Sequence, residues 1–262
     1  MKVMTLYFDR EGQHKFHKMT QVLLYSAKLQ GIDIDLVILG EMVGRRDHKH
    51  DNMVKFDAWY HYFKEQPYGA EILFLDSDTF ILRDVSDVFK QDFDIAITRK
   101  TDNDKINSGV VFVKKNKDSE RFFDAWYKNQ QMLYEDQNML EPLYSEYRGI
   151  NQAAFMLTIT SESINLISLP CKKYNAFKGD HLAPHDPELS IVHCHFGDLR
   201  TLIFGGVVAK KSNKRRAARR QALADKWKDF YSQAKHINIQ DYEYKLKGKE
   251  QWRNVIGYQL LD

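Results

Sequence analysis

The chain has 262 residues, of which 43% are hydrophobic, 13% aromatic and 29% charged, with only five prolines. This composition predicts a globular protein with enough apolar material for a substantial core, and it excludes a disordered chain. No run of about 18 apolar residues occurs, so no transmembrane helix is expected. Asp9 and Arg10 come too early for a signal-peptide core. Cys171 and Cys194 fit neither a disulfide framework nor a zinc motif, so a cytoplasmic location is expected.

The net charge of +3 is unevenly distributed along the chain. Residues 206–224 contain no acidic residue and seven basic ones: Lys210, Lys211, Lys214, Arg215, Arg216, Arg219 and Arg220. Without these seven, 32 basic residues face 36 acidic ones, so the remainder of the chain is mildly acidic. This distribution argues against a general nucleic-acid binder, although the pI of 8.6 by itself is typical of one.

Short apolar runs alternate with helical patterns from the first residues onward. Strands are predicted at residues 3–8, 34–39, 71–75, 95–98, 110–113, 164–169 and 190–195, and an apolar run also resumes after Asp78. Helices are predicted at residues 14–29, 52–65, 118–133, 151–158 and 214–235. Such alternation favours an open, largely parallel α/β sheet. We expect one domain over residues 1–205 and a helical extension over residues 206–262.

The sharpest local feature is Asp76-Ser77-Asp78, which directly follows the apolar run Ile72–Leu75. Ligands of open α/β sheets bind outside the carboxyl ends of the strands, so both carboxylates are expected at a ligand site. Two neighbouring carboxylates repel each other, and a hard divalent cation that bridges phosphates would stabilise them together. A solvated turn at the strand end is the alternative for this motif taken alone.

Further polar segments follow in a definite order. Lys55 stands 21 residues before Asp76, and the later segments are Asn107-Ser108-Gly109, Gly149-Ile150-Asn151-Gln152, Leu169-Pro170 with Tyr174-Asn175, and His193-Cys194-His195-Phe196-Gly197. In this order and spacing, residues 1–200 resemble the nucleotide-sugar glycosyltransferases of GT-A fold. The layout is most similar to the glycogenin and lipopolysaccharide galactosyltransferase group, glycosyltransferase family 8. The resemblance implies a Rossmann-like GT-A domain with a mixed central sheet.

The resemblance implies a metal site for Mn²⁺ or Mg²⁺ that holds the donor diphosphate. Asp76 and Asp78 match its acidic motif, and Ser77 between them is counted with the donor-binding residues. The family histidine stands three residues before a glycine. Because His193 stands four and His195 two residues before Gly197, either could be the ligand.

The resemblance also implies residues around the rest of the donor. Tyr7 lies where the family holds the nucleoside base, and Lys55 matches a lysine near the donor. Arg200 could replace a family lysine at the diphosphate, because the family Lys-Pro-Trp is absent here.

The sugar side of the site is implied by two further matches. Asn107 and Ser108 match the segment that lines the sugar and the acceptor. Asn151-Gln152 stands where the family has Asp-Gln, close to the reacting sugar carbon. A turn-forming role for Asn107 and a plain helical role for Gln152 remain alternatives.

The expected reaction transfers a sugar from a nucleotide-sugar donor, most simply a UDP-sugar, to a glycan, lipid-linked or protein acceptor. The resemblance implies retention of configuration. An inverting reaction would need a carboxylate opposite the leaving group, and Asp102, Asp104 or Asp136 could supply it. The expected alternatives are a haloacid-dehalogenase-type phosphohydrolase and a catalytically silent nucleotide-sugar or nucleic-acid binding protein. The phosphohydrolase motif normally follows the first strand and carries a glycine that is missing here.

The basic segment Lys210–Arg220 has three interpretations: a solvated helix face, a contact with anionic lipid, or a nucleic-acid patch. Trp227, Phe230 and Tyr231 continue the same predicted helix. Basic residues followed by aromatic ones favour a peripheral contact with an anionic membrane over specific nucleic-acid recognition.

Overall fold

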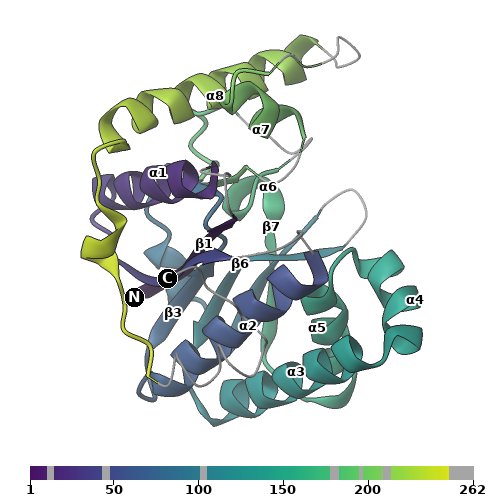
Figure 1. Ribbon diagram of the computed structural model, residues 1–262. Coiled ribbons are helices and arrows are strands. Elements are labelled where there is room, and N and C mark those ends of the chain that lie inside the picture. Colours follow the sequence, from purple (N-terminus) through teal and green to yellow (C-terminus); the bar gives the residue numbers. More distant parts are fainter. Residues whose placement is uncertain are drawn as a thin grey trace.

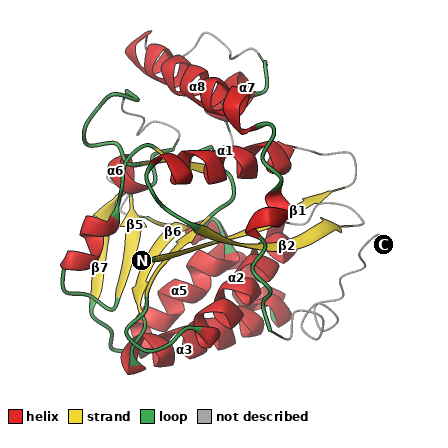
Figure 2. Ribbon diagram, turned by 90° about the vertical axis from the view of Figure 1, so that its left-hand side faces the viewer, coloured by secondary structure: helices red, strands yellow, loops and turns green. Residues whose placement is uncertain are grey.

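The computed structural model describes residues 1–10, 15–42, 48–100, 105–177, 183–194, 197–206, 208 and 214–247. A six-stranded sheet lies between two layers of helices (Figures 1 and 2). In spatial order its strands are β2 (Ile34–Met42), β1 (Lys2–Arg10), β3 (Glu71–Leu75), β6 (Ile106–Lys114), β5 (Ile95–Arg99) and β7 (Leu166–Pro170). Strands β4 (Thr79–Ile81) and β8 (Ile191–His193) form a separate antiparallel pair.

The sheet is mixed, as the resemblance implies. β1 is parallel to β2 and β3, and β5 is parallel to β7. β6 is antiparallel to both of its neighbours, β3 and β5. The expectation of a largely parallel sheet is therefore wrong at β6, because the short connection from β5 returns the chain beside it as a hairpin rather than through a crossover helix.

Each face of the sheet is covered by its own helices (Figure 2). One face carries α2 (His48–Glu65), α3 (Lys117–Glu135) and α5 (Ile150–Ser161), whose aromatic side chains form a large core cluster with the sheet. The other face carries α1 (Lys15–Leu29), with α7 (Asp198–Ile203) and α8 (Lys214–Ala234) packed outside it. The expected core residues Phe122, Phe123 and Trp126 are fully buried.

Most predicted elements are present with shifted ends, and several short ones are new. β1 and β2 are longer than predicted, α2 begins at His48, and the strand predicted at residues 190–195 is the shorter β8. Helix α4 (Gln137–Tyr147) was not predicted, because it contains Pro142 and buries only Leu140, which leaves no apolar stripe. The other additions are α6 (Cys171–Tyr174), α7 and two 3₁₀ turns, η1 (Ser86–Lys90) and η2 (Ile239–Tyr242).

The aromatic residues of α8 belong to the core. Trp227 and Phe230 are 3% and 6% exposed and pack in one cluster with Met19 and Val22 of α1, while Tyr231 is half-buried beside them. Their predicted contribution to a membrane contact is therefore wrong, because their apolar surface is already covered by the protein. Within the described ranges, no helix is both long and apolar enough to cross a bilayer.

Candidate functional site

Asp76 and Asp78 are held at the carboxyl end of a fully buried strand. Residues 72–75 of β3 are 0% exposed, and Thr5 and Leu75 pair across β1 and β3. The backbone N–H of Asp76 donates to the carbonyl of Gly109 at 2.9 Å, and the N–H and Oγ1 of Thr79 both donate to the carbonyl of Asp76. The acidic turn is therefore tied to the sheet on both sides, as the sequence predicts for a site at a strand end.

His193 joins this turn through the small sheet. Thr79 of β4 pairs with His193 of β8, and the N–H of Cys194 donates to the carbonyl of Asp78 at 2.7 Å. The Nε2 atom of His193 lies 3.0 Å from Oδ1 of Asp78 and 3.5 Å from Oδ2 of Asp76. Asp76, Asp78 and His193 each present a ligand atom, and these atoms lie within 4.8 Å of one another. Two carboxylates and one imidazole suit a divalent cation such as Mn²⁺ or Mg²⁺.

The electrostatics of this group are those of a cation site. Burial lowers the pKa of the His193 imidazole, but the charges of Asp78 and Asp76 outweigh it, and the pKa lies above its ordinary value. Lys55 is the first counter-charge, with Nζ 2.8 Å from Oδ1 of Asp76 and 4.8 Å from the centre of the Trp59 ring. Among the described residues, the two carboxylates thus have one lysine, Lys55, and one histidine, His193, as basic neighbours.

A bulge in β6 brings the predicted sugar-side residues to the same edge of the sheet. Ile97 pairs with Val111 but Thr98 pairs with Asn107, so β6 advances four residues while β5 advances one. Such bulges re-aim side chains beside functional sites. Ser108 Oγ lies 3.4 Å from Oε1 of Gln152, whose Nε2 donates to the carbonyl of Tyr147 at 2.7 Å. Ser108 and Gln152, 44 residues apart, are therefore neighbours.

Asn151 has an unusual environment. Its side chain is 1% exposed, and neither its Oδ1 nor its Nδ2 has a hydrogen-bond partner among the described residues. Its backbone carbonyl accepts from Nε1 of Trp126 at 3.0 Å, which fixes the first turn of α5. A buried amide without partners is costly, so its presence needs an explanation.

The remaining predicted residues lie at different distances from the acidic turn. Tyr7 continues β1 two residues beyond Thr5, at the level where β3 has ended, and its ring contacts that of His17 edge-on. Ser77 is half-buried between the two aspartates. Arg200 lies over the ring of Phe16 in α1, and its positive charge reaches the thiol of Cys194.

Some of the alternatives can be placed and others cannot. Asp136 accepts hydrogen bonds from the N–H groups of Asn138 and Met139 and so caps α4, which counts against it as a catalytic base. His195, Asp102 and Asp104 lie outside the described residues, as do Lys210 and Lys211 of the basic segment.

Two buried polar residues behind His193, Asn175 and Thr98, were given no role at the site by the sequence, although Asn175 belongs to one of the ordered polar segments. Asn175, which follows α6, hydrogen-bonds to His193, to Asn107 and to Thr98 of β5. Asn175 stands in the polar segment Tyr174-Asn175 of the sequence, but its contact with His193 requires three segments to meet.

The sequence of residues 66–198, just over half of the chain, matches the family described as nucleotide-diphospho-sugar transferase. The chain belongs to this family. The matched region contains Asp76, Asp78 and His193. The protein is thus a glycosyltransferase that uses a nucleotide-sugar donor, and the expected resemblance is confirmed. No match was found among curated proteins.

Solved structures of glycosyltransferases share the fold of this transferase. One is involved in glycosylation of the major capsid of PBCV-1, with a TM-score of 0.51, 13% identity, and coverage of 75% of this chain and 96% of that one. GlyE of Streptococcus pneumoniae TIGR4 has a TM-score of 0.53 and 13% identity, and the match covers 94% of this chain and 66% of that one. The galactosyltransferase LgtC, with donor and acceptor sugar analogues, has a TM-score of 0.49, 8% identity, and coverage of 97% and 99%.

Membership of this family removes the phosphohydrolase alternative. In the transferase, the acidic pair follows β3, the third strand of the chain, with β1 and β2 before it. This position differs from that of the phosphohydrolase nucleophile, which normally follows the first strand.

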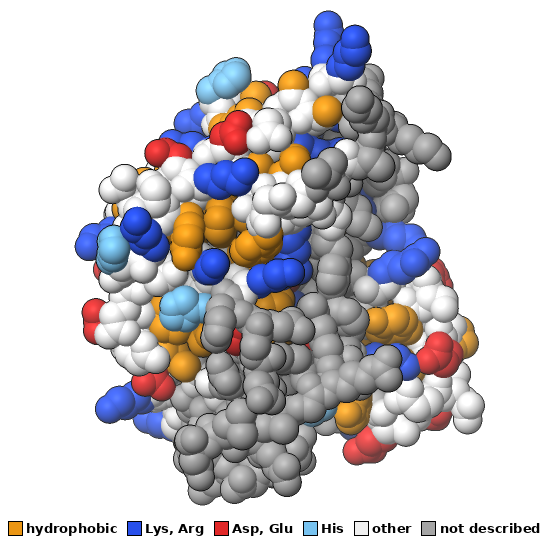
Figure 3. Space-filling view, turned by 45° about the horizontal axis from the view of Figure 1, so that its top comes forward, with side chains coloured by type: hydrophobic (Ala, Val, Ile, Leu, Met, Phe, Trp, Pro, Cys, Tyr) orange, Lys and Arg blue, Asp and Glu red, His pale blue; other side chains and the backbone are white. Residues whose placement is uncertain are grey.

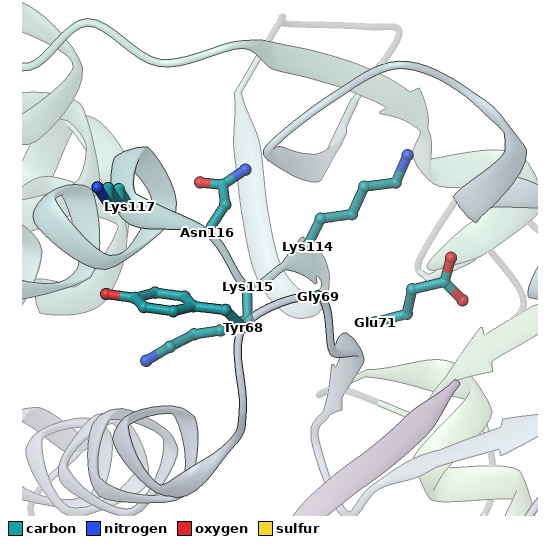
Figure 4. Close-up of a pocket in the computed structure, with 7 residues that line it drawn as sticks. All are labelled: Tyr68, Gly69, Glu71, Lys114, Lys115, Asn116 and Lys117. Atoms are coloured by element: carbon teal, nitrogen blue, oxygen red, sulfur yellow. The ribbon is translucent and has the colours of Figure 1, made fainter.

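A separate cavity of about 510 Å³ lies at the other end of the strands from the acidic turn, where β3 begins and β6 ends. Tyr68 and Lys115 point to one side of it, and Lys114 and Glu71 to the other (Figure 4). The ammonium group of Lys115 contacts Glu120, and that of Lys114 donates to the carbonyl of Gln91. Because these charges are engaged within the protein, we assign no ligand to the cavity.

Proposed function

We propose that this transferase binds a UDP-sugar through a divalent cation, Mn²⁺ or Mg²⁺, held by Asp76, Asp78 and His193. The observation that carries the proposal is the convergence of these three side chains, with ligand atoms within 4.8 Å, at the end of β3. A cation bound there would neutralise the charge that develops on the departing nucleoside diphosphate.

The neighbouring residues have separate roles in this proposal. Lys55 holds Asp76 in place and adds positive charge at the same end of β3. Tyr7 and Ser77 would lie toward the nucleotide, and Arg200, whose guanidinium lies over the ring of Phe16, would add positive charge for the diphosphate. We propose that these residues bind the donor and take no direct part in proton transfer.

Gln152 and Asn151 are proposed to face the sugar. Ser108 and Tyr147 orient the amide of Gln152, which would stabilise positive charge on the sugar carbon through its carbonyl oxygen. The buried amide of Asn151 would find its missing partners on the sugar. We propose retention, with the acceptor hydroxyl attacking from the face that the diphosphate leaves. The acceptor would be a glycan, a lipid-linked sugar or a protein.

The test is donor turnover and donor binding with variants of the acidic pair. With a panel of nucleotide-sugars, the wild-type protein is expected to release nucleoside diphosphate slowly in Mn²⁺ or Mg²⁺ and not in EDTA. Asp76→Asn and Asp78→Asn should each lower this release, and cation-dependent donor affinity, at least 100-fold, because each removes a charged ligand. NMR of the transferred sugar would report its anomeric configuration.

Asp118→Asn is the matched control, because Asp118 is an exposed carboxylate paired with Arg121 at the start of α3, near the opposite edge of the sheet. It should behave as the wild type. Undiminished donor affinity in both acidic-turn variants would contradict the proposal.

We also propose that the start of α8 contacts anionic membrane lipid. Residues 214–219, which include Lys214, Arg215, Arg216 and Arg219, are all exposed. Lys and Arg side chains stand out at the upper end of the molecule, toward the end of α8 that begins at Lys214 (Figure 3). The proposal rests on this charge, since the aromatic residues of α8 are buried.

A further inference from the structure

Asn175 lies behind His193, on the side of the imidazole away from the two aspartates. It is 0% exposed, and its backbone N–H donates to the carbonyl of Cys171 at 2.9 Å. Its side chain has three polar neighbours: His193 Nδ1 at 2.8 Å, Thr98 Oγ1 at 2.8 Å and Asn107 Oδ1 at 2.9 Å. Backbone N–H groups always donate hydrogen bonds and backbone carbonyls always accept them, and these fixed roles determine which of the three neighbours accepts and which donates.

The orientation of Asn107 is set first. The N–H of Gly109 is an obligatory donor and lies 2.8 Å from the side chain of Asn107, so the atom of Asn107 that faces it is the carbonyl oxygen. Thr98 Oγ1 lies 2.8 Å from the backbone carbonyl of Asn107, an obligatory acceptor, so the single hydroxyl proton of Thr98 is used there. Both Asn107 Oδ1 and Thr98 Oγ1 can therefore only accept from Asn175.

The orientation of Asn175 follows. Its amide nitrogen must face these two acceptors, which uses both of its protons. Its carbonyl oxygen therefore faces His193, and Nδ1 of His193 must be the donor in that contact. With the proton on Nδ1, the Nε2 atom of the neutral ring offers a lone pair, 3.0 Å from Asp78 and 3.5 Å from Asp76.

We propose that Asn175 is a positioning residue, which holds the neutral imidazole of His193 in the Nδ1–H tautomer so that Nε2 completes the cation site. Thr98 and Asn107 orient Asn175 and do not themselves touch His193 by a hydrogen bond. Asn107 thus acts on the site indirectly, because its Oδ1 accepts hydrogen bonds from Asn175 and from the N–H of Gly109. The proposal rests on the proposed cation site and deepens it, because it names the residues that determine how well that site binds its cation.

The test compares Asn175→Leu with a pair of variants at Thr98. Asn175→Leu removes the acceptor at nearly constant volume. Thr98→Val removes the hydroxyl that accepts from Asn175, whereas Thr98→Ser keeps it. Loss of such an orienting partner typically weakens metal binding by about 10- to 100-fold. The dissociation constant for Mn²⁺ alone, measured by EPR of free Mn²⁺ without any donor, should therefore rise about 10- to 100-fold in Asn175→Leu. It should rise less in Thr98→Val and stay near the wild-type value in Thr98→Ser.

A second readout uses the metal-free protein. The ¹⁵N chemical shifts of the His193 ring, recorded at a pH where the ring is neutral, should report the Nδ1–H tautomer in the wild type and a tautomer mixture in Asn175→Leu. Unchanged Mn²⁺ affinity in Asn175→Leu, or a wild-type ring protonated on Nε2, would overturn the proposal. A purely structural role would lower the metal-free melting temperature of Asn175→Leu without changing its Mn²⁺ affinity.

The two proposals fail in distinguishable ways. A wild-type protein that binds neither Mn²⁺ nor Mg²⁺ would overturn the proposed function. The tautomer measurement on metal-free protein would still test the role of Asn175, because it needs no bound cation. If Asn175→Leu does not fold, the Thr98→Val and Thr98→Ser pair decides. Equal Mn²⁺ affinity and equal ring spectra in those two variants would overturn the role of Asn175.

Discussion

Because Gly109 has no side chain, the backbone of β6 can approach the imidazole of His193. A Cβ atom added at Gly109 would lie 2.5 Å from Cε1 and 2.8 Å from Nδ1 of His193, and 2.9 Å from Oδ1 of Asn107. No real Cβ comes so close, and the imidazole is itself fully buried, so it cannot simply turn away. The missing side chain at this position therefore contributes to the geometry of the proposed cation site.

We predict that Gly109→Ala weakens Mn²⁺ binding at least 10-fold, because the ring must move away from Asp78 and Asn175. Overpacking of this kind should also lower the free energy of unfolding by about 1–3 kcal/mol. Calorimetric titration with Mn²⁺ and urea unfolding would measure the two effects.

Gly149→Ala is the control for this prediction. Its added Cβ would meet only the flexible end of Gln152, at 3.1 Å, and would not meet His193. It should therefore bind Mn²⁺ as the wild type does. Equal Mn²⁺ affinity in Gly109→Ala and Gly149→Ala would show that the close approach at Gly109 does not matter.

Among the helices, the packing of α2 on α3 buries a carboxyl group. Asp57 is 1% exposed, and Gln131 of α3 donates to its Oδ1 at 3.2 Å. Burial raises the pKa of Asp57 to about 7, although hydrogen bonds from Tyr127 and Gln131 oppose the rise. The folded protein therefore binds a proton that the unfolded chain has already lost between about pH 4 and pH 7.

This shift predicts a loss of stability as the pH rises. Because the folded state binds more protons in this range, the contribution of Asp57 to the free energy of unfolding falls from about pH 4 to pH 7 and is constant above it. Asp57→Asn removes this dependence. The free energy of unfolding of this variant, relative to that of the wild type, should therefore rise by on the order of a few kcal/mol from pH 5 to pH 8.

Urea unfolding of both proteins at pH 5 and pH 8 would measure this gain, and the comparison cancels the titration of all other groups. A stability difference between wild type and variant that is the same at both pH values would contradict the prediction.

The whole molecule brings together segments that are far apart in the chain. Lys55, the acidic turn, Asn107, Asn175 and His193 span 139 residues by number, yet a chain of hydrogen bonds and ion pairs joins them. α8 packs on α1 from the other end of the sequence, and residue 243, beyond α8, bridges to Leu36 of β2. The described residues of the predicted extension, 206–262, thus include several that contribute to the same core, while the domain boundary at residue 205 stays a prediction.

The proposed membrane contact predicts an effect of charge alone. The variant with Arg215, Arg216, Arg219 and Arg220 changed to Gln should bind vesicles of phosphatidylglycerol and phosphatidylcholine at least 100-fold more weakly. Each basic residue near an anionic surface contributes about 1 kcal/mol. Sedimentation at low and high salt would measure the binding.

The matched control changes the exposed residues Lys28, Lys90, Lys117 and Lys128 to Gln, which lowers the net charge equally. It should bind these vesicles nearly as well as the wild type. Equal loss in both variants, or no binding by the wild type, would exclude a specific contact at α8.

The class of fold, most of its elements and the acidic turn could be predicted from the amino-acid sequence. These are local properties: the apolar run Ile72–Leu75 is long enough to be a buried strand, and the polar residues after it must lie at its end. The order of Lys55, the acidic turn and the later histidine predicted a nucleotide-sugar transferase, which the family match confirms. Helix α4 was missed because its exposed surface and Pro142 carry no periodic apolar signal.

Which residues come into contact could be seen only once the chain was folded. The spacing around Gly197 left His193 and His195 as alternatives, and the pairing of Thr79 with His193 brings His193 to Asp78, while His195 lies outside the described residues. The role of Asn175 depends on three partners from β5, β6 and β8, so no pattern within one segment could reveal it. The physical reason is that hydrogen bonds form between neighbours in space, and the strand order β3-β6-β5 makes neighbours of residues that the chain separates.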